Sequence, residues 1–470
     1  MSKMFRTIAW IAVWGLFLAT CGIAIDDVNF SEVYLDSEDY AGEVSEVFVS
    51  EYIAIPTESM IELTTEHFLE DLDYMQYVLE NNFALFDVAY WAHGMCINSM
   101  FEGARDEMLN ADEMDLATFN SILIRNFTGL LGIGHFNISS PREFNLSQRD
   151  AILQWMDATE SQLLNFRALR RRVSSHHMNR YLDEQLDALQ RGDYEQVIQL
   201  DALLFERGRE DIEITQVLEE GQIAYLAIPH FAMTSRVSRT YQEEIFSFYE
   251  DIRDYEHLIV DLRGNPGGVT DLFYQLIVRP NIDRPFRADG YAFLRNGVYL
   301  QPYLIQPFFG FRGSRILSID TALIPVYEML ESFDLPHLNM NDMERMDYGF
   351  RIHTNIIPDA LSRFDYEPAF SGKIWVLTDH RMSSASQIAA WFAKESGFAT
   401  LVGDTTGGVF GGPRIEVALP NTDFTITFDI YYVTDSYGRP LEAGTIPHHF
   451  NRPNMDALET VLILIAEGAY

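Results

Sequence analysis

Short apolar segments alternate with helical ones from about residue 217 onwards, and this alternation constrains the fold more than any other feature. Four apolar segments are rich in branched side chains, as buried strands are: 222–228, 257–263, 373–379 and 399–404. Residues 271–278 and 386–396, which lie between them, suit helices. Because parallel strands need crossover connections, the sequence predicts an α/β fold with a mostly parallel sheet covered on both faces. Residues 414–433 predict a hairpin that turns at Pro420–Asp423.

Two regions ahead of this core are predicted from the same kind of patterning. Apolar side chains recur at intervals of three and four along two stretches, which are Phe68, Leu72, Met75 and Leu79, then Leu116, Phe119, Leu123, Phe127 and Leu130. This predicts an N-terminal helical domain over residues 59–142. Residues 143–216 are polar with helical patterning and are interpreted as a helical spacer. The α/β core then takes residues 217–470.

The first 21 residues are typical of an export signal. Lys3 and Arg6 precede an apolar run that is too short for an ordinary membrane span. The run ends in LATC, which resembles a bacterial lipobox and predicts that Cys21 becomes a lipidated N-terminal residue. Ordinary cleavage is the alternative, because Thr20 departs from the usual small residue. Residues 22–58 predict an acidic linker, and we expect an exported protein of the cell envelope, periplasm or cell surface, anchored by lipid.

The charge balance restricts the partners of the chain. It carries 70 acidic against 33 basic residues, a formal net charge of −37 at pH 7. This charge repels phosphate backbones and anionic head groups, so nucleic acid is not an expected partner. Contact with a membrane is expected only through the lipid anchor.

The cysteines and the paired histidines predict neither a disulfide framework nor a cofactor. Cys21 and Cys96 are the only cysteines, and Cys96 is interpreted as a small buried hydrophobe. His448 and His449 lack an acidic or cysteine partner at a recognised ligand spacing. A surface pair is therefore favoured, and no metal is predicted.

A glycine-bearing turn follows one of the predicted strands. This is DLRGNPGG, residues 261–268, which stands between a strand and a helix. The adjacent Gly267 and Gly268 let backbone amides point into open space at the carboxyl edge of the sheet, where amides can stabilise an oxyanion. The alternatives are a tight turn without chemistry and a loop that binds phosphate.

A second turn holds three serines in four positions. Residues 383–386, SSAS, follow a strand and begin a helix, a setting that exposes a nucleophile. The positive end of the helix favours an alkoxide, and the next backbone amide can join the first turn as an oxyanion donor. A serine that only caps the helix is the alternative.

These turns and their surroundings resemble the tail-specific, or C-terminal processing, serine peptidases and their tricorn-type relatives. The resemblance rests on HLIVDLRGNPGG, GKIWVLTDHRMSSASQIAAWFAKESGFATLVGDTTGG, GRPLEAGTIPHH and, ahead of the core, LLGIGH. It implies a crotonase-like catalytic core of the α/β class. It also implies that Ser384 attacks the peptide carbonyl and that Ala385 supplies one oxyanion amide, the other coming from Gly267 or Gly268. Gln387 stands where the family usually has glutamate.

One branch of the family uses a lysine as the base, and this chain offers none. Val409 stands at the lysine position of that branch. Lys3, Lys373 and Lys394 are the only lysines. Lys394 is about 15 Å along the helix that follows the serine. Lys373 begins a strand about 20 Å away, and Lys3 leaves with the signal.

The tricorn-type branch uses a histidine that comes from ahead of the core. This implies His135 as the general base and Glu442, in GRPLEAGTIP, as the carboxylate that orients the ring. The chain departs from the pattern at two places. Ile133 stands where the family often has aspartate, and Gly134 where tricorn-type proteins can have serine.

The predicted function is that of a secreted or lipid-anchored serine endopeptidase that hydrolyses unfolded proteins or peptides. The alternative is a binding module that kept the fold and lost catalysis, which the departures at Ile133 and Gln387 leave open. An acyl-CoA enzyme of the wider superfamily is disfavoured by export and by the few basic residues. No PDZ module is evident in residues 145–216, so specificity for chain ends is an open question.

Overall fold

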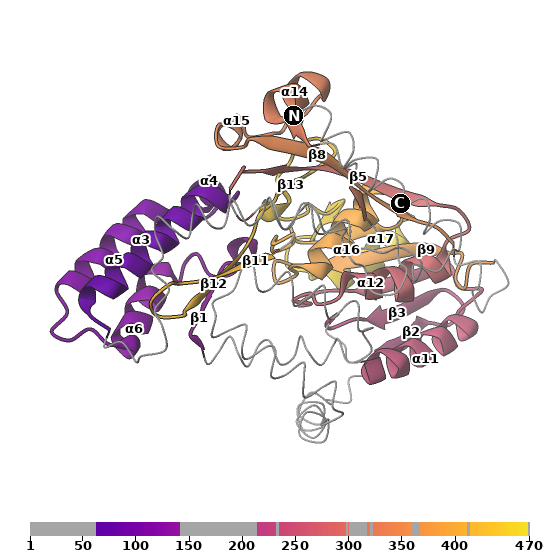
Figure 1. The fold of residues 1–470 in the computed structure, drawn as a ribbon. Coiled ribbons are helices and arrows are strands. Elements are labelled where there is room, and N and C mark those ends of the chain that lie inside the picture. The colour runs from indigo at the N-terminus through magenta and orange to yellow at the C-terminus, as the bar shows by residue number, and fades with distance from the viewer. Residues whose placement is uncertain are drawn as a thin grey trace, which may run out of the picture.

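The computed structural model describes residues 63–141, 214–231, 235–297, 299, 317–319, 323–358, 367–410 and 414–468 (Figure 1). The predicted export signal with Cys21, the acidic linker and nearly all of the helical spacer lie outside the described residues. Within the described part of the chain, no helix combines the length and the apolar character that a membrane crossing requires.

A six-stranded sheet forms the centre of the fold. Its order is β14-β10-β9-β4-β3-β2. The strands are β2 (Thr215–Glu219), β3 (Ile223–Ala227), β4 (His257–Asp261), β9 (Lys373–Thr378), β10 (Thr400–Gly403) and β14 (His449–Phe450). All neighbours are parallel except β2 and β3. The prediction of a mostly parallel sheet is confirmed.

Helices cover both faces of this sheet, as the alternating pattern predicts. On one face, α17 (Ala457–Ala466) packs its apolar side chains against Ile259, Trp375 and Val402. The opposite side chains of the same strands join the main core with the remaining helices. Those helices are α11 (Ser235–Asp251), α12 (Thr270–Phe273) with its π-turn Tyr274–Val278 and 3₁₀ turn Arg279–Asn281, and α16 (Ala385–Glu395).

A second, antiparallel sheet packs on the other side of α16. Its order is β13-β5-β8-β6, and a short strand β7 also pairs with β8. The elements are β5 (Phe286–Leu294), β6 (Leu317–Ile319), β7 (Ile324–Pro325), α14 (Val326–Ser332), α15 (Met340–Met343), β8 (Tyr348–Ile356) and β13 (Tyr432–Asp435). Because α16 lies between two sheets, it is buried on nearly every side. No local sequence pattern predicts this sheet, because its strands are distant from one another in the chain.

Four helices stand to one side of the core and form the start of the described chain (Figure 1). They are α3 (Thr65–Asn82), α4 (Phe86–His93), α5 (Ile97–Leu109) and α6 (Leu116–Phe127). Both predicted apolar faces are buried, apart from Leu116, which is exposed. The interpretation of Cys96 as a buried residue is wrong, because it precedes α5 at the surface.

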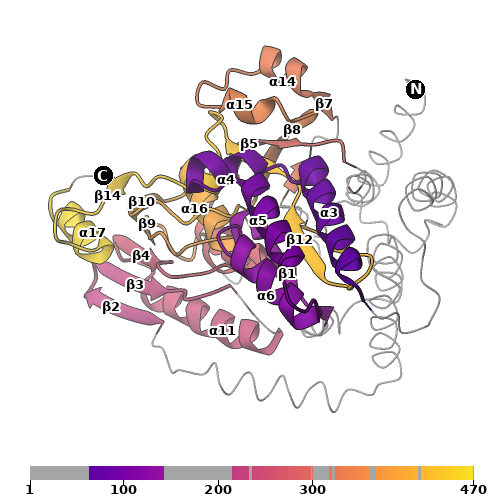
Figure 2. The same ribbon diagram turned by 90° about the vertical axis from the view of Figure 1, so that its left-hand side faces the viewer.

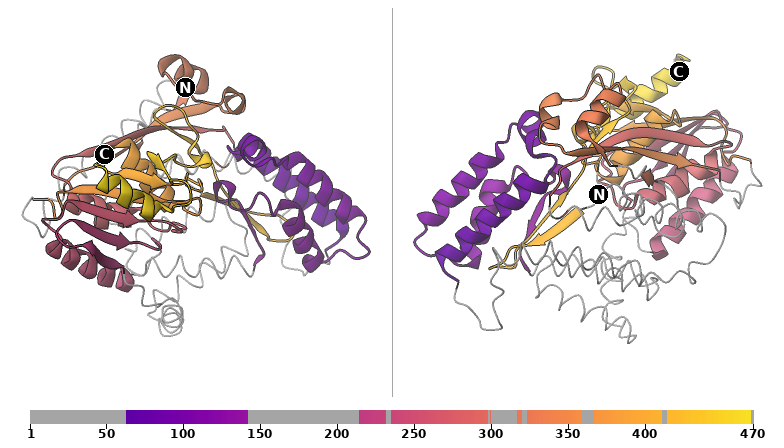
Figure 3. Two further views of the ribbon diagram at one scale, coloured as in Figure 1. Left: turned by 180° about the vertical axis from the view of Figure 1, so that it is seen from behind. Right: turned by 45° about the horizontal axis from the view of Figure 1, so that its top comes forward.

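A long hairpin joins these helices to the core. It consists of β11 (Arg414–Ala418) and β12 (Thr425–Asp429), as the sequence predicts, and β12 also pairs with β1 (Asn137–Ser139). Figures 2 and 3 show the hairpin extending from the core to the N-terminal helices. The antiparallel register pairs Asn137 with Thr427. If this register is continued by two places, residue 135 falls opposite residue 429.

Candidate active site

Ser384 occupies a strained turn between a strand and a helix. Strand β9 ends at Thr378, and α16 begins at Ala385, directly after the serine. Ser384 has φ 55° and ψ −121°, a backbone conformation that is costly for a residue with a Cβ. Its backbone N–H donates to the carbonyl of Val409 at 2.8 Å, which fixes the turn. The bend leaves the hydroxyl of Ser384 half-buried at the carboxyl edge of the sheet.

His135 reaches this serine from the N-terminal helices. It lies in a 3₁₀ turn, Ile133–His135, that connects α6 to β1, and it too has a positive φ, 51°. Its Nε2 is 3.0 Å from the Oγ of Ser384, within hydrogen-bond distance. The neighbouring Gly134 also has φ 51°, and a Cβ there would lie 2.5 Å from Leu85. A serine at 134 would therefore require Leu85 to move.

The carboxylate on the other ring nitrogen is that of Asp429. The Nδ1 of His135 lies 2.6 Å from Oδ2 of Asp429, which is 2% exposed at the end of β12. The expectation that Glu442 contacts the ring is therefore wrong. His135 lies two residues before β1 and Asp429 ends β12, and the antiparallel pairing of these strands brings the two side chains together. The only feature of the sequence that points to Asp429 is its position as an acidic residue at the end of an apolar strand pattern.

Glu442 instead bonds the backbone beside both His135 and Ser384. It lies in a 3₁₀ turn, Leu441–Ala443, and its Oε1 accepts the N–H of Gly134 at 2.8 Å. The backbone amides of Phe410 and Val409 also donate to this carboxyl group. Burial, with a smaller effect of the Asp429 charge, raises the pKa of Glu442 to about 8. Glu442 thus contacts the residue before His135 and the residue whose carbonyl holds Ser384.

Gln387, which replaces the usual glutamate, connects α16 to the segment that carries Glu442. Its Nε2 donates to the carbonyl of Leu441 at 3.1 Å and to the hydroxyl of Thr445 at 3.0 Å. Its Oε1 accepts a hydrogen bond from the hydroxyl of Thr406. An ionised glutamate can only accept, so it could not make the bond to Leu441. The departure from the family pattern therefore has a structural reason.

Two backbone amides remain as candidate oxyanion donors. The N–H of Gly267 donates to Oδ1 of Asn265 at 2.8 Å, so this expected donor is used inside its own turn. The N–H groups of Gly268 and Ala385 have no hydrogen-bond partner among the described residues. Gly267 has φ 102°, and a Cβ there would lie 2.8 Å from the Cβ of Ser384. Only glycine lets the first turn approach the serine so closely.

The remaining candidates lie away from the site. Lys394 donates to the carbonyl of Ile446 at 2.7 Å, and the Nζ of Lys373 lies 5.3 Å from the ring centre of Trp375. His448 accepts the N–H of Leu401 through its Nδ1 and so helps to hold β14. Over the described residues, no group of three or more histidine, cysteine or acidic side chains could hold a metal.

Comparison with known proteins supports a peptidase. Residues 222–450 match the model of peptidase family S41. No curated protein is similar enough to the chain to count as a match. Solved structures that resemble the chain at low identity include three whose TM-scores lie below 0.5.

The first is a candidate peptidase from Parabacteroides merdae ATCC 43184, with 15% identity, a TM-score of 0.47, and coverage of 87% of this chain and 98% of that one. The second is mature CPAF, with 14% identity, a TM-score of 0.47, and coverage of 82% and 92%. The third is a lipoprotein from Streptococcus agalactiae, with 11% identity, a TM-score of 0.38, and coverage of 88% and 100%.

The matched segment contains Ser384, Asp429, Glu442 and both turns, whereas His135 lies ahead of it. The family match thus coincides with the part of the chain in which the candidate nucleophile and the candidate oxyanion donors lie together. Residues 222–450 of the chain thus belong to peptidase family S41, the C-terminal processing peptidases, which makes the protein a serine-type peptidase.

Proposed function

We propose that the chain is a serine endopeptidase of the tricorn-type branch, in which Ser384 is the nucleophile and His135 the general base. The observation that supports this most strongly is the continuous series of contacts from Asp429 through His135 to Ser384. The substrate class is a polypeptide in an unfolded or extended form. The resemblance implies that Glu442 orients the imidazole ring. We propose instead that Glu442 is a positioning residue, which holds the backbone next to His135 through the N–H of Gly134.

The reaction proceeds by acyl transfer. The Oγ of Ser384 forms a bond to the carbonyl carbon of the substrate while its proton passes to Nε2 of His135. The amides of Gly268 and Ala385 donate to the resulting oxyanion. The C–N bond then breaks, and His135 gives its proton to the leaving amine. Water attacks the acyl ester, His135 takes a proton from that water, and the proton returns to Oγ as the acid product leaves.

Asp429 makes this proton transfer possible by two effects. Its carboxylate accepts a hydrogen bond from the Nδ1–H of His135, so the neutral ring presents an unprotonated Nε2 to the serine. It also stabilises the imidazolium that forms when the serine proton arrives. Because Asp429 is nearly inaccessible to water, its charge acts on the ring at short range with little screening.

A fluorophosphonate probe tests the proposal. Purified protein should be labelled at Ser384 and should cleave fluorescein-labelled casein, and Ser384→Ala should abolish both. Labelling at another serine would overturn the assignment of the nucleophile. Absence of labelling and cleavage in the wild type would instead support the binding module that has lost catalysis.

We propose the wider organisation on the strength of the sequence pattern and the family. The core is crotonase-like, and the chain is exported and anchored through a lipid on Cys21. The proposed parts are a signal at 1–21, a linker at 22–58, a helical domain at 59–142, a spacer at 143–216 and a peptidase core at 217–470. Growth with labelled palmitate should label the wild type and not Cys21→Ser. Equal labelling of both would remove the lipid anchor and leave the peptidase proposal intact.

A further inference from the structure

We propose that Ser383 and Ser386, which flank the nucleophile, are positioning residues that hold the oxyanion turn against Ser384. The oxyanion turn is residues 261–268. This inference rests on the proposed function, because it concerns the rate at which Ser384 is acylated. The proposed function gives a role to only one of the three serines of the SSAS motif, and the inference gives a role to the other two.

The two hydroxyl groups cross from the nucleophile turn to the oxyanion turn. Ser386 is fully buried, and its Oγ donates to the carbonyl of Asn265 at 2.6 Å, with the carbonyl of Ser383 also within reach at 2.8 Å. The Oγ of Ser383 donates to the carbonyl of Pro266 at 3.0 Å. Both acceptors come directly before the glycine pair. The serines therefore hold the segment that leads into Gly267 and Gly268.

Asn265 carries this restraint to the oxyanion donor. It is fully buried, and its Nδ2 donates to the carbonyl of Ile228 at 2.9 Å. Its Oδ1 accepts the N–H of Gly267 at 2.8 Å, which fixes the Pro266–Gly267 peptide, the neighbour of the peptide that carries the N–H of Gly268. We expect a shift of Asn265, whose carbonyl accepts from Ser386, to pass through this peptide to the amide of Gly268.

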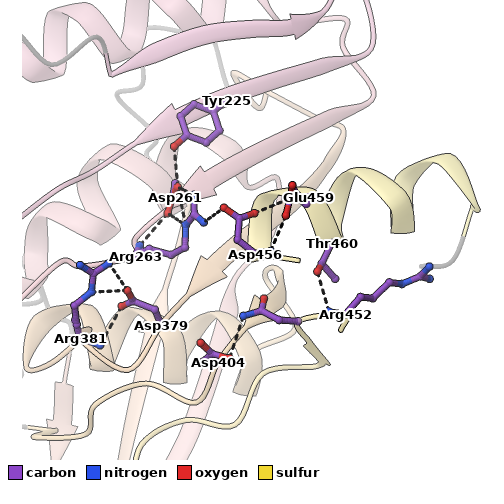
Figure 4. Close-up of polar contacts among 11 residues, drawn as sticks. Tyr225, Asp261, Arg263, Asp379, Arg381, Asp404, Arg452, Asp456, Glu459 and Thr460 are labelled. Atoms are coloured by element: carbon purple, nitrogen blue, oxygen red, sulfur yellow. Dashed lines mark hydrogen bonds and ion pairs between the residues drawn. The ribbon is translucent and has the colours of Figure 1, made fainter. Parts of the chain in front are cut away.

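The start of the oxyanion turn is held separately. Oδ1 of Asp379 accepts the N–H of Gly264 at 2.9 Å and that of Arg381 at 3.0 Å, so it joins the two turns at their base. Arg263 pairs with Asp261 and with Asp456 at the beginning of α17 (Figure 4). These contacts anchor the turn to the sheet. At its far end, the N–H of Phe231 donates to the carbonyl of Gly267 at 2.8 Å, and the two serines bond the carbonyls just before the glycines.

The contacts differ from those of helix-capping serines. A capping hydroxyl accepts an N–H from the first turn of its helix. Ser384, at the cap position of α16, makes no side-chain capping bond, and the hydroxyls of Ser383 and Ser386 donate to carbonyls. The capping alternative raised by the sequence is therefore wrong for this helix. An oxyanion donor must lie within about 3 Å of the developing charge, so small shifts of the turn slow the reaction.

The test compares Ser386→Ala and Ser383→Ala with Ser396→Ala. Ser396 is a matched control because its hydroxyl also donates to a backbone carbonyl, that of Phe392, at the opposite end of the same helix. Each variant is measured for its rate constant and end-point stoichiometry of fluorophosphonate labelling, and for casein cleavage. We expect the rate constant to fall about 10- to 100-fold in Ser386→Ala and about 3- to 10-fold in Ser383→Ala. Ser396→Ala should stay within about twofold.

The stoichiometry and the pH profile separate positioning from a general loss of structure. If the serines position the oxyanion turn, labelling reaches completion and the pH of half-maximal rate is unchanged, because His135 and Asp429 are untouched. If instead only part of the variant protein is labelled, and that part reacts with the wild-type rate constant, the serines maintain the fold and do not position the turn, which would overturn the inference. If Ser386→Ala does not fold, Ser383→Ala decides by the same criteria, since its bond is at the surface.

Failure of this inference is distinct from failure of the proposed function. Wild-type protein that is neither labelled nor active removes the proposed function and this inference with it. Wild-type protein that is labelled at Ser384, together with serine variants as fast as Ser396→Ala, overturns only the inference.

Discussion

Ser384 and His135 reach the same site from two regions that are assembled differently. Ser384 comes from a strand, a turn and a helix that follow one another in the core. His135 comes from the N-terminal helices, and its carboxylate Asp429 comes from a hairpin 294 residues later in the chain. The nucleophile therefore depends on local structure, whereas the base depends on the docking of two distant segments. A change that weakens the contact between the N-terminal helices and the hairpin should displace His135 and leave the turn that carries Ser384 in place.

The two residues that react should show the largest effect. Ser384→Ala and His135→Ala should each lower kcat by about four to six orders of magnitude, because each removes a partner in the same proton transfer. The double variant should be little worse than either single one. Hydrolysis of labelled casein measures all three. Substantial activity in His135→Ala would show that the docked region does not supply the base.

Substitution of the two buried carboxyl groups, those of Asp429 and Glu442, should lower kcat to very different extents. Asp429→Asn should lower kcat by about 10²- to 10⁴-fold, because the neutral amide stabilises the imidazolium less and its NH₂ can donate to Nδ1, which places the ring proton on Nε2. Glu442→Gln should cost about tenfold or less near pH 7. With a pKa of about 8, Glu442 is mostly protonated there, and glutamine resembles that neutral form. Equal losses in the two variants would restore Glu442 to the role that the resemblance implies.

Glu442 should also make stability depend on pH. Its pKa is raised from 4.5 to about 8 in the folded chain, so between these values the folded state binds more protons than the unfolded one. The contribution is full below about pH 4.5 and is lost as pH rises through about 8. The melting temperature of the wild type should fall between about pH 4.5 and pH 8, and that of Glu442→Gln should fall less over the same range. The same slope in both proteins would contradict the burial of an ionisable group at this position.

The tip of the hairpin offers a way to disturb docking alone. Asp71 on α3 accepts the N–H of Asn421 at 2.9 Å and both the N–H and the hydroxyl of Thr422, at 2.9 and 2.6 Å. Asp71→Ala leaves these buried donors unpaired and should cost about 2–4 kcal/mol of unfolding free energy. It should also lower kcat about tenfold, because β12 carries Asp429. Chemical denaturation and casein cleavage measure the two effects.

Asp73→Ala is the matched control for that variant. Asp73 lies on the same helix and pairs with Arg105, but its side chain is 59% exposed. Exposed ion pairs contribute little, so both stability and activity should be nearly unchanged. An equal loss of activity in the two variants would show that α3 matters for reasons other than its hold on the hairpin.

The difference between the two regions also explains what the sequence could predict. The β9–α16 turn and the central sheet follow from patterns within short windows, and both were predicted. Asp429 was missed because its contact depends on the register of β1 against β12, which no local pattern reveals. The antiparallel sheet was missed for the same reason. The hydrogen bond from the N–H of Gly267 to the side chain of Asn265, which removes Gly267 as an oxyanion donor, could not be predicted because it depends on the orientation of one peptide group.

The smallest effect should come from the lysines, which supply the base in another branch of the family. Lys394 binds the carbonyl of Ile446, and Lys373 lies over Trp375, so neither has a contact with Ser384. Arginine keeps the charge and can retain both contacts. Lys373→Arg and Lys394→Arg should therefore change kcat and KM by less than about twofold. A loss of activity in either variant comparable to that of His135→Ala would show that a lysine of the core activates the serine, and that the docked histidine is not required.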